Sequence, residues 1–203
     1  MEAIKRWESK ALGCWQKAKE LRLNFYKEFI TANQEGKIVN VACGLVPQAL
    51  IAGFGDFVHL QGEPYGASCG FDQKFSEEAI DAFEVKGFAR DLWSYLKNQL
   101  GSIYINKYLF GGEFPKPTFV LSGHGCDTHA KWAQLIAEHY RVPLYVLDLG
   151  IADMSEKKTQ RKIEYLTEQL FECTEWLERV TGKKFDEERF REAFINTTQV
   201  GQL

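Results

Sequence analysis

The stretch TFVLSGHGCDTHAKWAQLIAEHYRVPLYVLD, residues 118–148, decides the fold. Its apolar run at 118–122 predicts a strand, and the spacing of apolar residues over 127–140 predicts a helix. Residues 143–148 repeat the strand pattern. A strand, a helix and a second strand in succession are typical of neighbouring parallel strands. The stretch therefore indicates an α/β protein.

The same alternation continues towards the N-terminus. KIVNVA, residues 37–42, and DFVHL, residues 56–60, predict two further strands. Pro47 between them suits the first turn of a helix. Together these patterns predict a short parallel sheet of about four strands with helices on both faces.

Helical patterns make up most of the remaining chain. They occupy residues 3–33, 76–100 with a break near Gly87, 155–180 and 186–197. We therefore expect three parts: an N-terminal helix in 1–35, an α/β lobe in 36–150 and a C-terminal helical segment in 151–203.

The composition is that of an ordinary globular protein, with 45% hydrophobic and 26% charged residues. A net charge of -3 argues against a nucleic-acid partner. No apolar run is long enough for a membrane helix, and the first ten residues lack the apolar core of a secretory signal. Five cysteines without a CxxC pair indicate free thiols in a reducing compartment, so we expect a cytoplasmic protein with no membrane partner.

Ligands of parallel sheets bind beyond the carboxyl ends of the strands. Three predicted loops fit this position, and each carries one cysteine. They are 43–47 with Cys43, 61–70 with Cys69 and 122–127 with Cys126.

Cys126 has the most suggestive surroundings of these cysteines. It precedes the first turn of a predicted helix, where backbone N–H groups and the helix dipole favour a thiolate. His124 and His129 could face the same crevice. The residues alone leave open a capped helix with a buried thiol, a Cys–His nucleophile and a zinc site. They contain no nucleotide-binding glycine motif.

Four segments, in this order, resemble the family of benzoyl-CoA reductases and 2-hydroxyacyl-CoA dehydratases. They are GKIVNVACGLVPQALIAGFGDFVHLQGEPYGA (36–67), GFARDLWSYLKNQLGS (87–102), PKPTFVLSGHGCDTHAKWAQLIAEHYRVPLYVLD (115–148) and TGKKFDEERFREAF (181–194).

The resemblance implies a subunit of an oxygen-sensitive acyl-CoA reductase or dehydratase complex. It also implies a homologous partner subunit, an ATP-hydrolysing activator that delivers an electron, and a [4Fe-4S] cluster beside the acyl-CoA. Cys126 matches the family's second cluster cysteine, and cluster iron is held by thiolates. Cys69 could supply another ligand from its neighbouring loop, and His124 would lie near the thioester or ring. Residues 115–148 look closer to the aromatic branch, which favours reduction of the benzoyl-CoA type.

Three departures from the family pattern favour an alternative. Trp93 stands where the family has its first cluster cysteine, and Gln48 and Ala49 stand where it has an acidic pair. The sequence is also about half of the family's usual length. This alternative is a degenerate or split subunit that serves as a structural partner. A third hypothesis is an unrelated Cys-dependent enzyme that uses Cys126 and a histidine. If the chain is part of an enzyme, we expect the sulfur of Cys126 to lie at the carboxyl edge of the sheet and to face a cleft.

Overall fold

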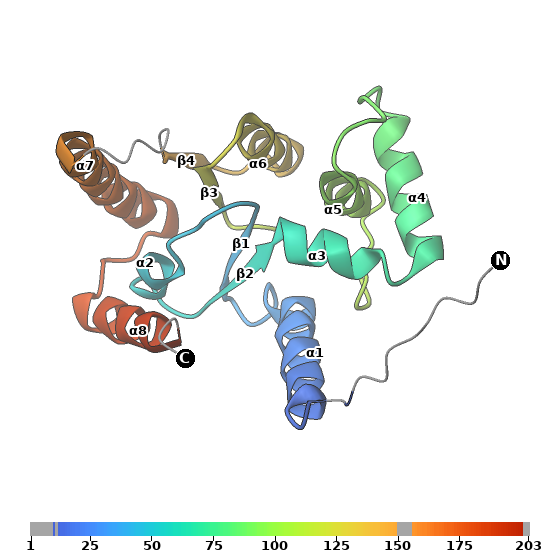
Figure 1. Cartoon of the computed structure of the whole chain (residues 1–203), viewed down its shortest axis with the longest axis horizontal. Coiled ribbons are helices and arrows are strands. Elements are labelled where there is room, and N and C mark those ends of the chain that lie inside the picture. The colour runs from blue at the N-terminus through green and yellow to red at the C-terminus, as the bar shows by residue number, and fades with distance from the viewer. Residues whose placement is uncertain (1–9, 11, 150–155, 201–203) are drawn as a thin grey trace.

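The computed structural model describes residues 10, 12–149 and 156–200 (Figure 1). The helices and strands follow one another as α1 (Trp15–Thr31), β1 (Ile38–Ala42), α2 (Gln48–Ala52), β2 (Phe57–Gln61), α3 (Gly62–Cys69), α4 (Gln73–Glu84), α5 (Ser94–Tyr104), β3 (Val120–His124), α6 (Asp127–Tyr140), β4 (Leu144–Asp148), α7 (Glu156–Thr181) and α8 (Glu187–Val200). None of these helices combines the length and apolar character that crossing a bilayer requires.

The strands form two parallel pairs, β1 with β2 and β3 with β4. A single parallel bridge between Asn40 and Phe119 connects the pairs, so the strands lie in the order β2–β1–β3–β4. The Asn40 side chain strengthens this connection. Its amide nitrogen donates to the carbonyl of Leu121 at 3.0 Å, and its oxygen accepts from the Leu121 N–H at 2.9 Å. This arrangement confirms the predicted short parallel sheet.

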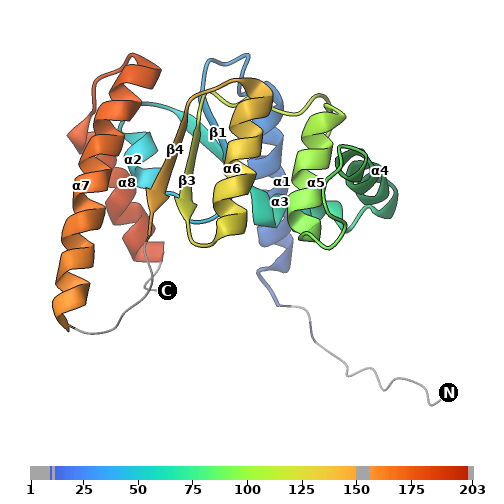
Figure 2. The ribbon, with the colours of Figure 1, turned by 90° about the horizontal axis from the view of Figure 1, so that it is seen from above.

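Side chains of β1 alternate between two cores. Val39 and Val41 pack in a core with residues of α1, α3, α5 and α6, whereas Ile38 packs in a second core with α2 and α7. Figures 1 and 2 show the helices divided accordingly, with α2, α7 and α8 on one side of the strands and α3, α5 and α6 on the other. Helices cover both faces, as the sequence predicts.

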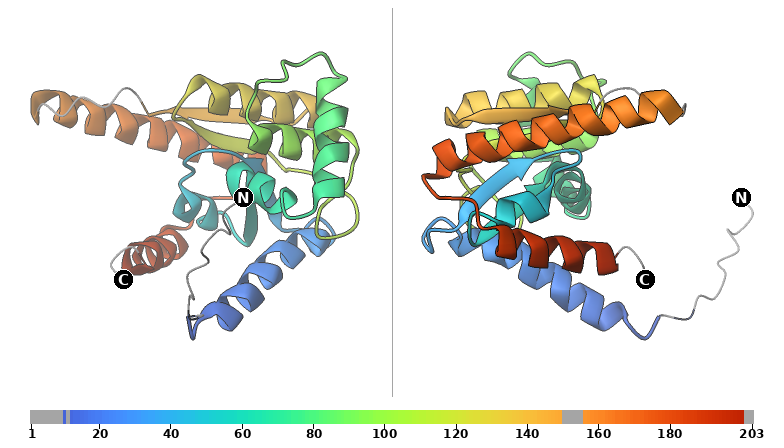
Figure 3. Two further views of the ribbon diagram at one scale, coloured as in Figure 1. Left: turned by 45° about the vertical axis from the view of Figure 1, so that its right-hand side comes forward. Right: turned by 90° about the vertical axis from the view of Figure 1, so that its left-hand side faces the viewer.

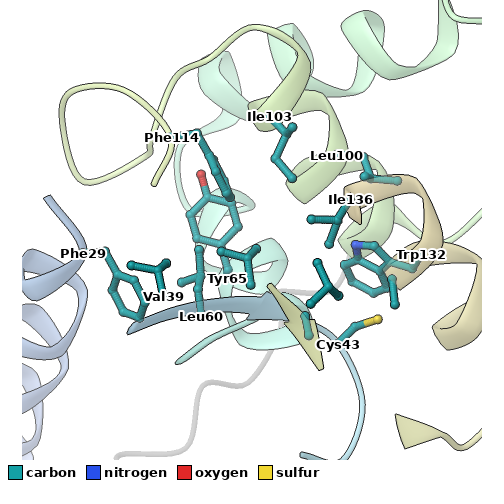
Figure 4. Close-up of a cluster of buried hydrophobic side chains, with 14 of the residues drawn as sticks. Phe29, Val39, Cys43, Leu60, Tyr65, Leu100, Ile103, Phe114, Trp132 and Ile136 are labelled. Carbon is teal, nitrogen blue, oxygen red and sulfur yellow. The ribbon is translucent and has the colours of Figure 1, made fainter. Parts of the chain in front are cut away.

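The first core holds the largest buried side chains. In Figure 4, Tyr65 and Leu60 lie beside β1, and Trp132 and Ile136 approach from α6. Glycine makes this packing possible at Gly62, where a Cβ atom would lie 2.6 Å from the Trp132 ring. The start of α3 can therefore sit directly against α6.

Helix α1 is shorter than the predicted 3–33. Among the described residues it begins at Trp15, and the part of the prediction over residues 1–9 and 11 lies outside them. Only Tyr26 and Phe29 of this helix are buried, so tertiary packing holds its C-terminal half. Figure 3 shows α1 extending away from the strands.

The prediction of a loop at 61–70 is wrong, because Gly62–Cys69 form helix α3. Pro64 lies in its first turn, where the missing N–H of proline costs no hydrogen bond. Gly66 lets the helix touch α5, since a Cβ atom there would lie 2.6 Å from the Tyr95 backbone. The helical pattern at 76–100, with its break near Gly87, corresponds to two helices, α4 and α5. The first begins earlier than expected, after Asp72, whose side chain accepts from the Phe75 N–H at 3.0 Å.

Candidate functional site

Three neighbouring strands end at one edge of the sheet. Because β1, β2 and β3 are parallel, the residues that follow them meet there. Cys43 and Gly44 follow β1, Glu63 lies in the first turn of α3 after β2, and Cys126 follows β3 as the N-cap residue of α6. This edge is where parallel sheets place their ligands.

Cys126, His129 and Glu63 form a connected set at this edge. The Cys126 sulfur is exposed and lies 3.6 Å from Nδ1 of His129. Nε2 of the same ring lies 2.7 Å from Oε1 of Glu63, a distance that fits an ion pair, although the ring's direction is not that of a hydrogen bond. A thiol, an imidazole and a carboxylate in series are the arrangement that activates nucleophilic cysteines.

Backbone groups hold the carboxylate and the ring in place. The N–H of Gly44 donates to Oε1 of Glu63 at 3.0 Å. Gly44 has a φ of 74°, and a Cβ atom there would lie 3.4 Å from the His129 ring and 3.0 Å from the carbonyl oxygen of Gly123. A glycine is therefore needed where the chain turns this closely against the imidazole.

Trp93 shelters the histidine. It is the N-cap residue of α5, and its ring centroid lies 6.0 Å from that of His129 with the planes at 81°. The His129 side chain is only 17% exposed, whereas Trp93 is about half exposed. The indole thus offers an accessible apolar surface next to the imidazole.

Cys43 lies at the same edge but is fully buried. Its thiol donates to the carbonyl of His129 at 3.3 Å, which anchors the first turn of α6. Burial raises the pKa of this thiol, and the charge of Glu63 raises it further. Cys43 therefore stays a neutral thiol at physiological pH, whereas the sulfur of Cys126 is open to solvent.

The structure does not bring Cys69 to this set. Cys69 ends α3 inside the first core, where burial raises its pKa to about 12 despite hydrogen bonds with Tyr65 and Ser102. His124 ends β3 and contacts Asp127 instead of the cysteine, with Nε2 3.2 Å from the Asp127 carboxylate. Asp127 is the first residue of α6, directly after the N-cap residue Cys126.

The thiols of this edge do not by themselves fit an iron–sulfur cluster, which needs several thiolates. Cys126 is exposed, Cys43 is a buried neutral thiol, and Trp93 has no atom that ligates iron.

Glu63 is the site residue that could not be picked out from the sequence. Its segment reads as a loop because glycine and proline flank it, and only the suitability of Pro64 for a first helical turn signals α3. Both His124 and His129 are expected near Cys126 from their positions in the chain. In the structure it is His129 that contacts Cys126, and its ring lies between the Cys126 thiol and the Glu63 carboxylate.

An apolar cavity adjoins the far side of the 43–47 loop. Its volume is about 620 Å³, and it lies between α2, α7 and α8. Its lining includes Val46, Pro47, Leu170, Phe171, Phe190 and Phe194. Phe171 and Phe194 are largely exposed, so this face of the described structure presents aromatic side chains to solvent.

Known proteins resemble this chain over most of its length. The alpha subunit of (R)-2-hydroxyisocaproyl-CoA dehydratase from Clostridioides difficile is 28% identical over 180 residues, 88% of this chain and 43% of the relative. The alpha subunit of (R)-phenyllactyl-CoA dehydratase from Clostridium sporogenes is 30% identical over 62% of this chain and 30% of the relative. A benzoyl-CoA reductase subunit from Thauera aromatica is 29% identical over 57% of this chain and 27% of the relative.

The aligned part thus spans less than half of each of these relatives. The family described as 2-hydroxyglutaryl-CoA dehydratase, D-component, matches residues 43–203, which include the whole of the edge built by Cys43, Glu63 and Cys126. The resemblance inferred from the four sequence segments is confirmed: this chain belongs to the 2-hydroxyglutaryl-CoA dehydratase D-component family.

Proposed function

We propose that the chain is a subunit of an acyl-CoA dehydratase or reductase complex and that the β1–β3 edge faces the thioester. The observation that carries the proposal is the family match over residues 43–203, which spans every loop of that edge. The named relatives act on acyl-CoA compounds, and carboxyl ends of parallel strands are where such ligands bind. Free thiols suit the reducing cytoplasm in which we expect the complex to work.

The edge suits a thioester for reasons of shape. Gly44 and Gly125 let the backbone pass close beside His129, where a side chain would meet the imidazole. Trp93 supplies an exposed flat surface against which an apolar acyl group can pack. We favour an aromatic acyl group of the benzoyl-CoA type, on the strength of residues 115–148 and of this flat indole.

A [4Fe-4S] cluster at this edge would need ligands from another chain beside Cys126. The thiolate of Cys126 would then be the contribution of this chain, because it is the exposed thiol of the edge. The ATP-hydrolysing activator expected from the resemblance would serve that assembled centre.

The partner that we propose is a homologous subunit of the same family, seated on the apolar cavity of α2, α7 and α8. The relatives are themselves named as subunits, and each extends well beyond the aligned part. Phe171 and Phe194 would be buried by such a neighbour. Apolar patches of this kind are typical of protein interfaces.

A second candidate function is a structural subunit without a reaction of its own. Trp93 in place of a cluster cysteine, and Gln48 and Ala49 in place of acids, favour it. The two candidates share the partner and differ in whether the edge matters for turnover.

Anaerobic co-expression with a homologous family subunit, followed by turnover assays with benzoyl-CoA and a 2-hydroxyacyl-CoA, separates them. The catalytic proposal expects an isolable complex whose turnover falls at least tenfold in Cys126→Ser, with Cys14→Ser as the exposed-thiol control. A complex with unchanged turnover in Cys126→Ser would favour the structural role. Failure to form any complex would contradict both.

A further inference from the structure

We propose that, in the chain without its partner subunit, α1 of a second copy occupies the apolar cavity between α2, α7 and α8. The inference rests on the partner surface of the proposed function and adds how that surface is regulated. Among the described residues none of α1 lines the cavity, and Figure 1 shows α1 apart from α7 and α8. The helix that enters the cavity therefore comes from another copy.

Helix α1 carries an apolar stripe that its own chain leaves uncovered. Trp15, Leu21 and Phe25 are each about half exposed. Together with Ala18 they follow one another at spacings of three and four residues, so they lie along one face of the helix. The buried residues of α1 both belong to its C-terminal half. Because a short helical stretch without tertiary packing is only marginally stable in water, the N-terminal half gains from a neighbour that covers this stripe.

The cavity matches the stripe in size and in chemistry. It measures about 620 Å³, and its aromatic lining includes Phe171 from α7 and both Phe190 and Phe194 from α8. Grooves of this kind take the apolar face of an amphipathic helix, whose anchors recur at three, four and seven residues. One contact would thus bury two apolar surfaces that the single chain leaves in water.

Acidic side chains flank the cavity along α7. Between residues 163 and 178 this helix carries five glutamates and no lysine or arginine. Glu164, Glu168 and Glu175 are exposed, and each lies three, four or seven residues from Phe171. At these spacings they stand beside the phenylalanine on the same side of the helix. The rim of the cavity is therefore negatively charged.

The charges of α1 have the opposite sign. Its 17 residues include four basic and two acidic side chains, a net charge of +2. Lys17 and Arg22 border the apolar stripe on its two sides, as their positions relative to Leu21 and Ala18 show. A basic helix over an acidic rim is the complementarity that selects one partner and fixes its orientation. Added salt should weaken such a contact.

The homologous subunit of the proposed function would occupy the same cavity. It must therefore displace α1 before it can bind. Self-association of the chain and assembly with its partner exclude one another at this surface, and a lone subunit keeps its apolar cavity covered until the partner arrives.

Sedimentation velocity of the full chain over a range of concentrations tests the contact. We expect self-association that weakens as salt is added. Leu21→Glu on the stripe and Phe171→Glu in the cavity should each weaken it at least tenfold. Leu23→Glu is the matched control, because Leu23 is exposed on the opposite side of α1. Thermal melting at concentrations where the chain is monomeric establishes that each variant is folded.

Mixing the two weakened variants identifies which surfaces meet. The Leu21→Glu variant keeps an intact cavity, and the Phe171→Glu variant keeps an intact α1. Their mixture should therefore form a dimer through one intact contact, although neither associates alone. A contact between two cavities, or between two α1 helices, would leave the mixture monomeric and would overturn the inference.

Titration with the homologous subunit separates this inference from the function on which it rests. The subunit should dissociate the self-associated chain. A wild-type chain that stays monomeric but binds the homologous subunit would overturn the role of α1 and leave the proposed partner standing. Complementation of the two variants without any binding of the homologous subunit would overturn the proposed partner and leave the contact of α1 standing.

Discussion

At the scale of single residues, His59 is the side chain whose protonation the fold opposes most clearly. It lies in β2 and is buried, with Nδ1 3.2 Å from the Asn40 amide. Burial lowers its pKa to about 4 from the ordinary value of 6.5. The imidazole is therefore neutral in the folded protein at physiological pH.

Acid should destabilise the protein through this residue. Between pH 6.5 and about 4 the unfolded chain binds a proton at His59 that the folded chain does not. Stability that is fully present above pH 6.5 is thus lost as the pH falls through this window, at up to about 1.4 kcal/mol per pH unit. Urea unfolding at pH 7.5, 6 and 5 should show this loss, and His59→Gln should reduce its slope. An unchanged slope in the variant would contradict the assignment.

The sequence predicts some residues of the edge well and others poorly. Cys43 and Cys126 can be placed at strand ends because apolar runs show where strands stop. The contact of Glu63 with His129 joins residues that lie 66 positions apart in the chain, and no local pattern encodes it. Cys69 was misplaced because its glycine- and proline-containing segment reads as a loop, whereas packing against α5 makes it a helix.

At the scale of secondary-structure elements, the side chain of Asn40 in β1 makes hydrogen bonds to the backbone of β3 in place of the backbone–backbone bonds of a regular sheet. Asn40→Ala would leave the N–H and C=O of Leu121 buried without partners, which should cost about 2–4 kcal/mol of unfolding free energy. Asn33 makes the same pair of bonds to the backbone of Lys116, but on the exposed surface. Asn33→Ala should therefore cost less than about 1 kcal/mol. Equal losses in urea titrations of the two variants would refute this interpretation.

The crossing of α4 and α5 depends on Gly101. A Cβ atom there would lie 1.8 Å from the carbonyl oxygen of Ala79, so the helices must separate to admit alanine. Although alanine favours helices, Gly101→Ala should destabilise the fold by about 1–3 kcal/mol. Gly13→Ala, at a position with open space around it, is the control. A rise in melting temperature for Gly101→Ala would show that the helices do not pack this closely.

At the scale of the whole molecule, the sheet divides the chain into two sides with different surfaces. Figure 1 shows α3, α5 and α6 on one side of the strands and α2, α7 and α8 on the other. On the second side, Phe171 of α7 and Phe194 of α8 line the apolar cavity and are largely exposed. The sequence predicted both helices but not their exposed face. An amphipathic pattern shows that one face is apolar without showing how much of it the chain itself covers.

This face should govern association with the homologous subunit. Phe171→Glu should weaken the complex at least tenfold in a titration of the two subunits, because it places a charge in the proposed apolar interface. Phe71→Glu is the matched control, since Phe71 is also largely exposed but does not line the cavity. Each of the two variants, measured without its partner, should have the melting temperature of the wild type. Equal weakening by the two substitutions would point to a different interface.

Hydrogen–deuterium exchange of the assembled complex, with and without benzoyl-CoA, tests most directly whether the acyl-CoA site lies at the carboxyl edge of β1 and β3. Bound acyl-CoA should slow exchange in residues 43–47 and 123–129 and leave α4 unchanged. Protection confined to other segments, with these two loops exchanging at their free rate, would contradict the placement of the site.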